Sequence, residues 1–121
     1  MKKILIVEDN EDILESTKEI LELKGFEVQI AINGKIGLAL AQQECPDLII
    51  SDIMMPQMDG FEMLNILNKN GKTAMIPFIF LTAKTQKFDR LQGAFYGADR
   101  YLTKPFTAAE LLKNVDEVLR D

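Results

Sequence analysis

Short apolar runs alternate with amphipathic stretches five times along this chain, and no linker separates them. The apolar runs predict strands at Lys3 to Val7, Glu27 to Ala31, Leu48 to Ser51, Pro77 to Leu81 and Arg100 to Thr103. Three of these runs are almost wholly apolar, as strands covered on both faces of a sheet must be. The alternation therefore predicts an α/β protein with a mostly parallel, doubly wound sheet between two layers of helices.

The amphipathic stretches predict the helices. Apolar residues recur at helical spacing from Ile13 to Leu21, and Gly25 follows as a stop signal. Thr107 and Glu110 have the spacing of a capping box at the start of the last helix. The other three helices are expected near Gly34 to Glu44, Gly60 to Asn68 and Lys87 to Tyr96.

Composition excludes several kinds of chemistry. The 121 residues contain no histidine, which removes Ser-His-Asp and Cys-His nucleophilic sites and most zinc enzymes, and Cys45 has no partner for an intrachain disulfide. The length fits one domain over residues 1–121. A net charge of −5 disfavours direct nucleic-acid binding. The apolar run after Met1 is too short for a signal peptide or a membrane span, so we expect a cytoplasmic protein with protein partners.

Candidate functional residues follow four of the predicted strands. Glu8 and Asp9 follow the first strand, Asp52 the third, Thr82 the fourth and Lys104 the fifth. Ligands of parallel sheets bind beyond the carboxyl ends of the strands. A central first strand would bring these side chains together at one edge.

The residue types at this edge suit phosphoryl transfer. Three carboxylates in one small pocket repel each other, and Mg²⁺, which prefers oxygen ligands, relieves that repulsion. One carboxylate could then act as the nucleophile and form an aspartyl phosphate. Lys104 would neutralise charge on the transferred group, and Thr82 would donate a hydrogen bond to it.

Each of these residues also has a simpler interpretation. Glu8 and Asp9 could only favour a helix N-terminus, Asp52 could be a turn residue, Thr82 a strand-end hydroxyl and Lys104 a surface cation. The functional interpretation depends on their occurring together. Methionines and phenylalanines that could suggest other sites are expected to pack in the core: Met54, Met55, Met58, Met63, Phe78, Phe80, Phe95 and Phe106.

Four motifs in order resemble the receiver domains of two-component response regulators over Lys3 to Leu119. They are the run from Ile4 to Asp9, the run from Asp52 to Gly60, Leu81-Thr82-Ala83, and the run from Gly97 to Phe106. The resemblance implies a flavodoxin-like (βα)5 three-layer sandwich with a five-stranded parallel sheet in the order 2-1-3-4-5. The acidic pair is Glu8-Asp9, where many receivers carry two aspartates.

The resemblance also implies the roles of the site residues. Asp52 is the phosphoacceptor, Asp9 a direct Mg²⁺ ligand, Glu8 a ligand through water, and the backbone carbonyl of Met54 a further ligand. Thr82 and Lys104 correspond to the switch hydroxyl and the phosphate-binding lysine, and Tyr101 to the aromatic switch residue. The Lys104-Pro105 peptide bond is expected to be cis.

The implied function is that of a signalling switch, not an enzyme beyond its own phosphorylation and dephosphorylation. The donor would be the phosphohistidine of a histidine kinase or a histidine phosphotransfer protein, docking on the first helix near Glu15, Lys18 and Glu22. The fourth helix, fifth strand and fifth helix, roughly Lys87 to Arg120, would form the output surface for an effector. A phosphorylation-dependent dimer is a further option, and no contact with nucleic acid or membrane is expected.

Three other functions compete with this one. A phosphatase of the haloacid dehalogenase type is disfavoured because Asp52-Ile53-Met54 lacks the second aspartate of the Asp-x-Asp motif. A flavin-binding electron carrier is disfavoured because the acidic loop from Glu8 to Asp12 would repel an anionic cofactor. An interaction module that works without phosphorylation stays open. The chain stops where the last helix should end, which leaves no room within it for a DNA-binding or catalytic output domain, and we expect either a stand-alone receiver or the first part of a longer regulator.

Overall fold

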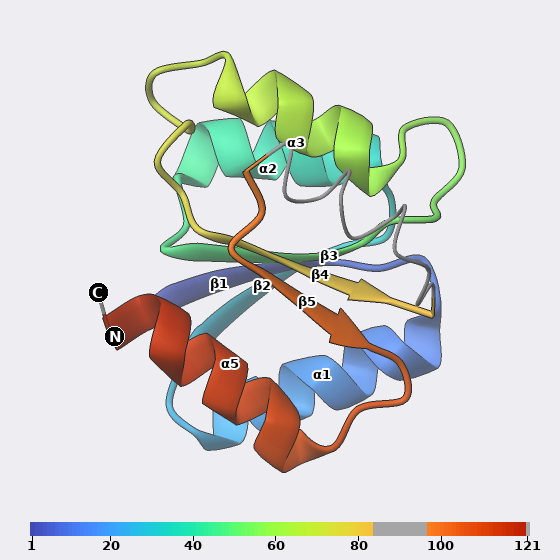
Figure 1. Ribbon diagram of the computed structural model, residues 1–121, viewed down its shortest axis with the longest axis vertical. Coiled ribbons are helices and arrows are strands. Elements are labelled where there is room, and N and C mark those ends of the chain that lie inside the picture. The colour runs from blue at the N-terminus through green and yellow to red at the C-terminus, as the bar shows by residue number, and fades with distance from the viewer. Residues whose placement is uncertain (84–96, 121) are drawn as a thin grey trace.

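Five parallel strands form the central layer of the protein in a computed structural model that describes residues 1–83 and 97–120 (Figure 1). The strands are β1 (Lys3–Val7), β2 (Glu27–Ala31), β3 (Leu48–Asp52), β4 (Phe78–Thr82) and β5 (Arg100–Thr103), in the order β2-β1-β3-β4-β5. The expected fold class and strand order are confirmed. The helix expected at Lys87 to Tyr96, and Phe95 within it, lie outside the described residues.

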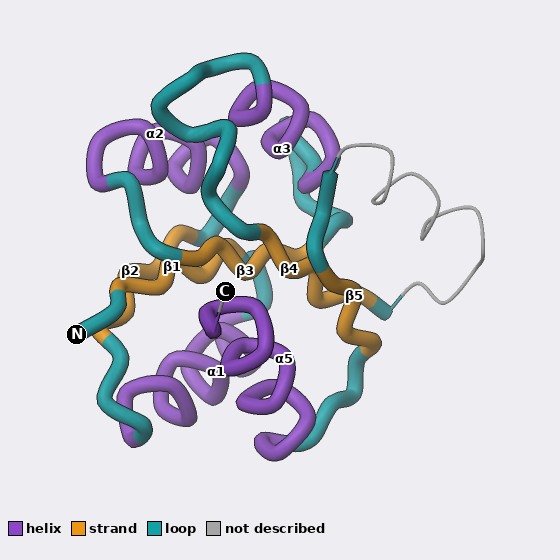
Figure 2. Tube along the Cα trace, turned by 60° about the vertical axis from the view of Figure 1, so that its left-hand side comes forward, coloured by secondary structure: helices purple, strands orange, loops and turns teal. Residues whose placement is uncertain are grey.

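Helices cover both faces of this sheet (Figure 2). α1 (Glu11–Leu23) and α5 (Ala108–Arg120) lie on one face, and α2 (Gly34–Glu44) and α3 (Gly60–Asn68) lie on the other. Alternate strand residues point to opposite faces, so the sheet contributes to two separate cores. Ile4 and Ile6 belong to the core under α1 and α5, whereas Leu5 and Val7 belong to the core under α2 and α3.

The helix starts explain why the chain turns where it does. The side chains of Asn10, Asn33 and Asp59 accept backbone hydrogen bonds at the starts of α1, α2 and α3. The predicted capping box is confirmed, because the Thr107 amide donates to Glu110 Oε1 and the Glu110 amide donates to Thr107 Oγ1, both at 3.0 Å. Each loop at the carboxyl ends of β1, β2 and β3 thus leads into a helix whose first turn is fixed by a side chain.

Three expectations need correction. β3 extends through Asp52 and β4 through Thr82, so both residues lie at the ends of strands and not after them. β4 begins at Phe78, because Pro77 has no amide to donate and only accepts a bond from the Ile49 amide.

The prediction that Met54 packs in the core is also wrong. Its side chain is 58% exposed, whereas Met55 and Met63 are buried as expected. Phe78 and Phe80 are buried as well, and Phe106 is partly buried against the core under α1 and α5. Among the described residues, no helix is long and apolar enough to cross a membrane.

Candidate functional site

The carboxyl ends of β1 and β3 lie side by side at the centre of the sheet. Val7 pairs with Ser51 in the β1–β3 register, and Asp52 pairs with Leu81 of β4. Glu8 directly follows Val7, so Glu8 and Asp52 come to the same edge of neighbouring strands. This edge, with Glu8, Asp9, Asp52, Thr82 and Lys104, is called the carboxyl edge below.

Three carboxylates converge there. Glu8, Asp9 and Asp52 each present an oxygen, and the three oxygens lie within 4.8 Å of one another. Glu8 is 1% exposed and Asp52 is 8% exposed, whereas Asp9 is open to solvent. A cluster of oxygen donors with one solvent-facing member fits a hard divalent cation that retains water ligands. The residues present therefore fit Mg²⁺.

Lys104 joins two of these carboxylates from the end of β5. Its Nζ lies 2.6 Å from Glu8 Oε1 and 3.1 Å from Asp52 Oδ2. Its backbone amide donates to the Thr82 carbonyl at 2.8 Å, and the following peptide bond, to Pro105, is cis, the isomer that the resemblance implies. The lysine is thus held by β4 through its backbone, and through its side chain by Asp52 of β3 and by Glu8, which follows β1.

The buried charges shift the pKa values of both partners. Burial raises the pKa of Glu8 above its usual value, although the hydrogen bond from Lys104 opposes that shift. Burial lowers the pKa of Lys104, but its hydrogen bond to Glu8 and the charges of Asp52 and Glu8 outweigh burial and leave that pKa raised. Burial therefore destabilises the charged form of Glu8, whereas the charged form of Lys104 remains favoured. A further cation at this edge would stabilise the Glu8 carboxylate.

The loop after Asp52 is closed tightly over the start of α3. The Ile53 amide donates to Asp52 Oδ1 at 2.7 Å, and the Gly60 amide donates to the Ile53 carbonyl at 2.8 Å. A Cβ on Gly60 would overlap the Asp52 carbonyl oxygen and the Phe80 ring. Glycine is thus required for α3 to begin this close to the carboxyl edge.

Thr82 and Tyr101 complete the set of expected residues. Thr82 is buried at the end of β4, next to Thr103 in the β4–β5 register. The Tyr101 ring is half-buried with its centroid 5.4 Å from that of Phe80. The structure therefore brings Glu8, Asp9, Asp52 and Lys104 together and places Thr82 at the same edge.

Sequence reasoning missed two features of this edge. Asn10 caps α1 with its side chain, and its own amide donates to Glu8 Oε2 at 3.1 Å, which orients the carboxylate. The signal was present, because asparagine two residues after an acid, just before an apolar stripe, is a typical N-cap. The second feature is an apolar groove of about 430 Å³ beside Lys104, lined by Ile13, Ile20, Pro105 and Phe106 among others.

Comparison with known families decides what this arrangement is. A family model described as the response regulator receiver domain matches residues 4–116. The chain belongs to the receiver domain family. The resemblance drawn from the four motifs is thereby confirmed.

Relatives of this receiver differ in how much of their length it spans. It is 45% identical over 120 residues to the DNA-binding dual master transcriptional regulator RpaA of Synechocystis sp., covering 99% of this chain and 50% of that protein. It is 42% identical to Protein PilH of Pseudomonas aeruginosa, covering 98% of both. The receiver therefore spans about half the length of RpaA and nearly all of PilH.

Solved receiver structures superpose closely on this one. Chemotaxis protein CheY4 of Vibrio cholerae matches with a TM-score of 0.93 and 36% identity over 98% of both chains. The receiver domain of sensor histidine kinase PA1611 of Pseudomonas aeruginosa, with a magnesium ion coordinated in its active site cleft, matches with a TM-score of 0.92 and 28% identity over 99% of this chain and 98% of that one. The described residues therefore have the receiver fold.

Proposed function

We propose that this receiver is switched by a phosphoryl group on Asp52, transferred in a Mg²⁺-dependent reaction. The observation that carries the proposal is the meeting of Glu8, Asp9 and Asp52, with oxygens within 4.8 Å of one another, under a lysine that contacts two of them. In the transfer, an Asp52 oxygen bonds to phosphorus while the bond from phosphorus to the donor's histidine nitrogen breaks. The nitrogen keeps that electron pair and then takes a proton.

Glu8, Asp9, Asp52 and the backbone carbonyl of Met54 would hold the metal. Mg²⁺ supplies positive charge that offsets the charge of the three carboxylates and of the incoming phosphoryl oxygens. Asp9, as the exposed member, is the proposed direct ligand besides Asp52, and Glu8 is the proposed ligand through water. The magnesium in the PA1611 receiver domain supports this assignment.

Lys104 and Thr82 would bind the oxygens of the phosphoryl group on Asp52. Lys104 already bridges Glu8 and Asp52, so the new oxygens on Asp52 would be acceptors within its reach. The Thr82 hydroxyl would donate to a second phosphoryl oxygen. Because Lys104 and Thr82 are joined through their backbones, a shift of one is transmitted to the other.

The switch would be read on the surface that includes β5 and α5. Movement of Thr82 toward the phosphoryl group would free space for Tyr101, which now packs on Phe80. This change would bias the proposed output surface, of which β5 and α5 lie among the described residues. A downstream effector, or a second copy in a phosphorylation-dependent dimer, would bind there.

The proposed donor is the phosphohistidine of a histidine kinase or phosphotransfer protein, and it would dock on α1. Three α1 side chains were expected to be exposed, and Glu15 and Glu22 are exposed. Lys18 is half-buried, and its ammonium lies 3.8 Å from the Glu22 carboxylate. The groove between Ile13, Ile20 and Phe106 adds an apolar anchor next to Lys104, which contacts Asp52. We propose that an apolar side chain of the donor occupies this groove. We also propose that the transfer takes place in the cytoplasm.

The test is phosphorylation by a small phosphodonor, followed by intact-mass spectrometry. We expect one phosphoryl group per chain with Mg²⁺ and none when the metal is chelated. Asp52→Asn should abolish the adduct, whereas Asp59→Asn, which alters the N-cap of α3 in the same loop, should retain it. No adduct on the parent protein despite bound Mg²⁺ would instead favour an interaction module that works without phosphorylation.

A further inference from the structure

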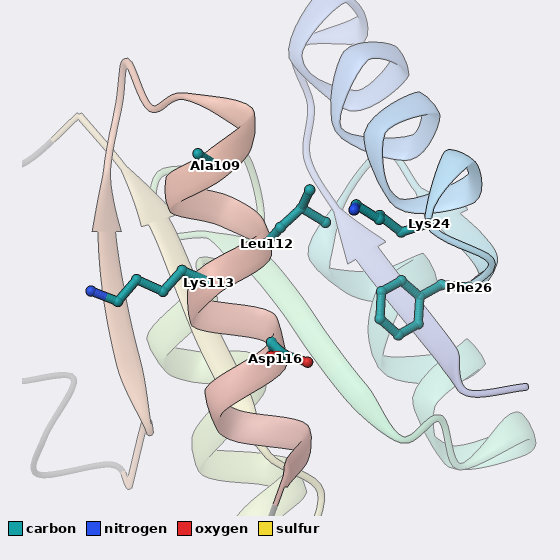
Figure 3. Close-up of a pocket in the computed structure, with 6 residues that line it drawn as sticks. All are labelled: Lys24, Phe26, Ala109, Leu112, Lys113 and Asp116. Atoms are coloured by element: carbon teal, nitrogen blue, oxygen red, sulfur yellow. The ribbon is translucent and has the colours of Figure 1, made fainter.

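The two ends of α1 have different surroundings. The C-terminal end lies beside a groove of about 430 Å³ that is lined by Lys24, Phe26 and four residues of α5 (Figure 3). The N-terminal end begins at its cap, Asn10, two residues after Glu8 of the carboxyl edge. The 13 residues of the helix, about 20 Å at 1.5 Å per residue, separate the two ends. The N-terminal end is therefore the one that reaches the proposed site.

Asn10 is fixed by hydrogen bonds to the first turn of α1. Its side-chain Oδ1 accepts from the amides of Asp12 at 3.0 Å and Ile13 at 3.1 Å, and its carbonyl accepts from the Leu14 amide at 2.9 Å. The Asn10 amide itself donates to Glu8 Oε2 at 3.1 Å. The start of the helix thus determines where this amide points.

The Glu8 carboxylate has a different partner on each oxygen. Oε2 accepts from the Asn10 amide, whereas Oε1 lies 2.6 Å from the Lys104 ammonium. The side chain is 1% exposed, so bulk water does not readily replace a lost partner. Without the Asn10 bond, the remaining attraction would turn the carboxylate toward Lys104 and away from Asp9 and Asp52.

We infer that Asn10 is a positioning residue for the metal site and acts through Glu8. Its amide keeps one Glu8 oxygen from turning to Lys104, and that oxygen retains a lone pair for a metal-bound water. Lys104 and Mg²⁺ are both cations and compete for the same carboxylate, so the Asn10 bond favours the metal. This inference rests on the proposed Mg²⁺ site. Asparagine caps the helix without adding a fourth carboxylate there.

The first test is Mg²⁺ titration calorimetry on cap variants. Asn10→Ala removes the cap and should weaken Mg²⁺ binding roughly tenfold, as loss of a bond that orients a metal ligand commonly does. Asn10→Ser restores a capping oxygen and should bring the affinity back. Asn33→Ala is the matched control, because Asn33 caps α2 by accepting from the Ile36 amide at 2.8 Å. It should lower stability as Asn10→Ala does and keep the parental affinity.

A second control weakens α1 from its other end. Gly25, between the groove residues Lys24 and Phe26, has a φ of 92°, and an added Cβ would meet nothing within 4 Å. Gly25→Ala therefore strains only the backbone. Urea unfolding should show that this variant and Asn10→Ala are both destabilised, whereas Mg²⁺ affinity should fall only in Asn10→Ala.

The outcomes separate this inference from the proposed function. Parental Mg²⁺ affinity in Asn10→Ala, or equal weakening by Gly25→Ala or Asn33→Ala, would overturn the positioning role while leaving the metal site intact. A parent protein that does not bind Mg²⁺ would contradict the proposed function, and this inference with it.

The last test removes the competing cation. Lys104→Met leaves Glu8 without an ammonium to turn to, so Mg²⁺ should bind this variant more tightly than it binds the parent. In this background Asn10→Ala should weaken Mg²⁺ binding by a smaller factor than in the parent, and a double-mutant cycle measures the difference. An undiminished loss of affinity would contradict competition between Lys104 and the metal for Glu8.

Discussion

Both edges of the sheet carry acids that accept hydrogen bonds from the rest of the protein, but the two edges use them differently. At the carboxyl edge, Glu8 and Asp52 share the Lys104 ammonium. Lys104 lies 96 residues after Glu8 and 52 residues after Asp52 in the chain. At the opposite edge, called the amino edge, Asp47 and Asp99 each bind the backbone. Asp47 accepts from the Lys3 amide and donates its own amide to the Lys3 carbonyl, both at 2.8 Å.

Asp99 repeats that pattern one strand pair away. It accepts from the Phe78 amide and donates to the Phe78 carbonyl, again at 2.8 Å. These reciprocal bonds fix the start of β1 against the approach to β3, and the start of β4 against the approach to β5. An acid satisfied by backbone cannot leave without breaking a strand, whereas an acid satisfied by a lysine side chain can exchange that partner for a ligand. The comparison separates structural acids from the proposed functional ones.

The largest effect is expected at Gly60, where the carboxyl edge has no spare room. Gly60→Ala would push a methyl group into the Asp52 carbonyl and the Phe80 ring, and we expect the free energy of unfolding to fall by about 3 kcal/mol. Phosphorylation at Asp52 should fall with it. Gly71→Ala is the matched control, since nothing lies within 4 Å of its added Cβ, and urea unfolding of the two variants measures the difference.

The amino edge can be broken without touching the site. Asp99→Ala leaves the Phe78 amide without its side-chain acceptor, so the free energy of unfolding should fall by about 1–3 kcal/mol while Mg²⁺ affinity stays unchanged. Asp99→Asn keeps an acceptor oxygen and should lose less. A loss of Mg²⁺ affinity in either variant, measured by titration calorimetry, would show that the two edges are not independent.

The buried Glu8 makes stability depend on pH at the carboxyl edge. Its pKa is raised in the folded state, so the folded protein binds more protons than the unfolded chain, and stability falls as pH rises above about 4.5. With metal chelated, Glu8→Gln should remove this loss, and its advantage in melting temperature should grow from acid to neutral pH. Saturating Mg²⁺ should reverse the order, because only the parent carries the carboxylate ligand. An advantage that does not change with pH would refute the electrostatic explanation.

The smallest effect is expected at Cys45, in the turn that leads into the amino edge. Cys45 ends α2 with a left-handed backbone, φ 45° and ψ 66°, which disfavours side chains and suits glycine. Cys45→Gly should therefore raise the free energy of unfolding, measured in urea, by about 0.5–1 kcal/mol. Cys45→Ala keeps the strained backbone and should give no gain in the same experiment.

The carboxyl edge could be predicted from sequence because it follows from strand periodicity. Apolar runs located β1, β3 and β4, and residues at their ends then had to share an edge. The capping box at Thr107 and Glu110 could also be predicted, because it depends on only two residues, three positions apart in the sequence. In local patterns of this kind, the spacing of the residues in the sequence determines how they lie in the structure.

What could not be predicted depends on packing between distant segments. The sequence does not say that Lys104 pairs more closely with Glu8 than with Asp52, since that choice follows from side-chain positions across β1, β3 and β5. The exposure of Met54 follows from how the loop before Gly60 closes, and apolar character alone suggested the core. The roles of Asp47 and Asp99 likewise require knowledge of which strands are neighbours.

The most direct test of the account is to locate the phosphoryl group chemically. After incubation with a small phosphodonor and Mg²⁺, borohydride reduces an aspartyl phosphate to homoserine, and peptide mass spectrometry identifies the position. We predict homoserine at Asp52 alone. Homoserine at Asp47, Asp59 or Asp99, or at no position while the protein still binds Mg²⁺, would contradict the division between a functional carboxyl edge and a structural amino edge.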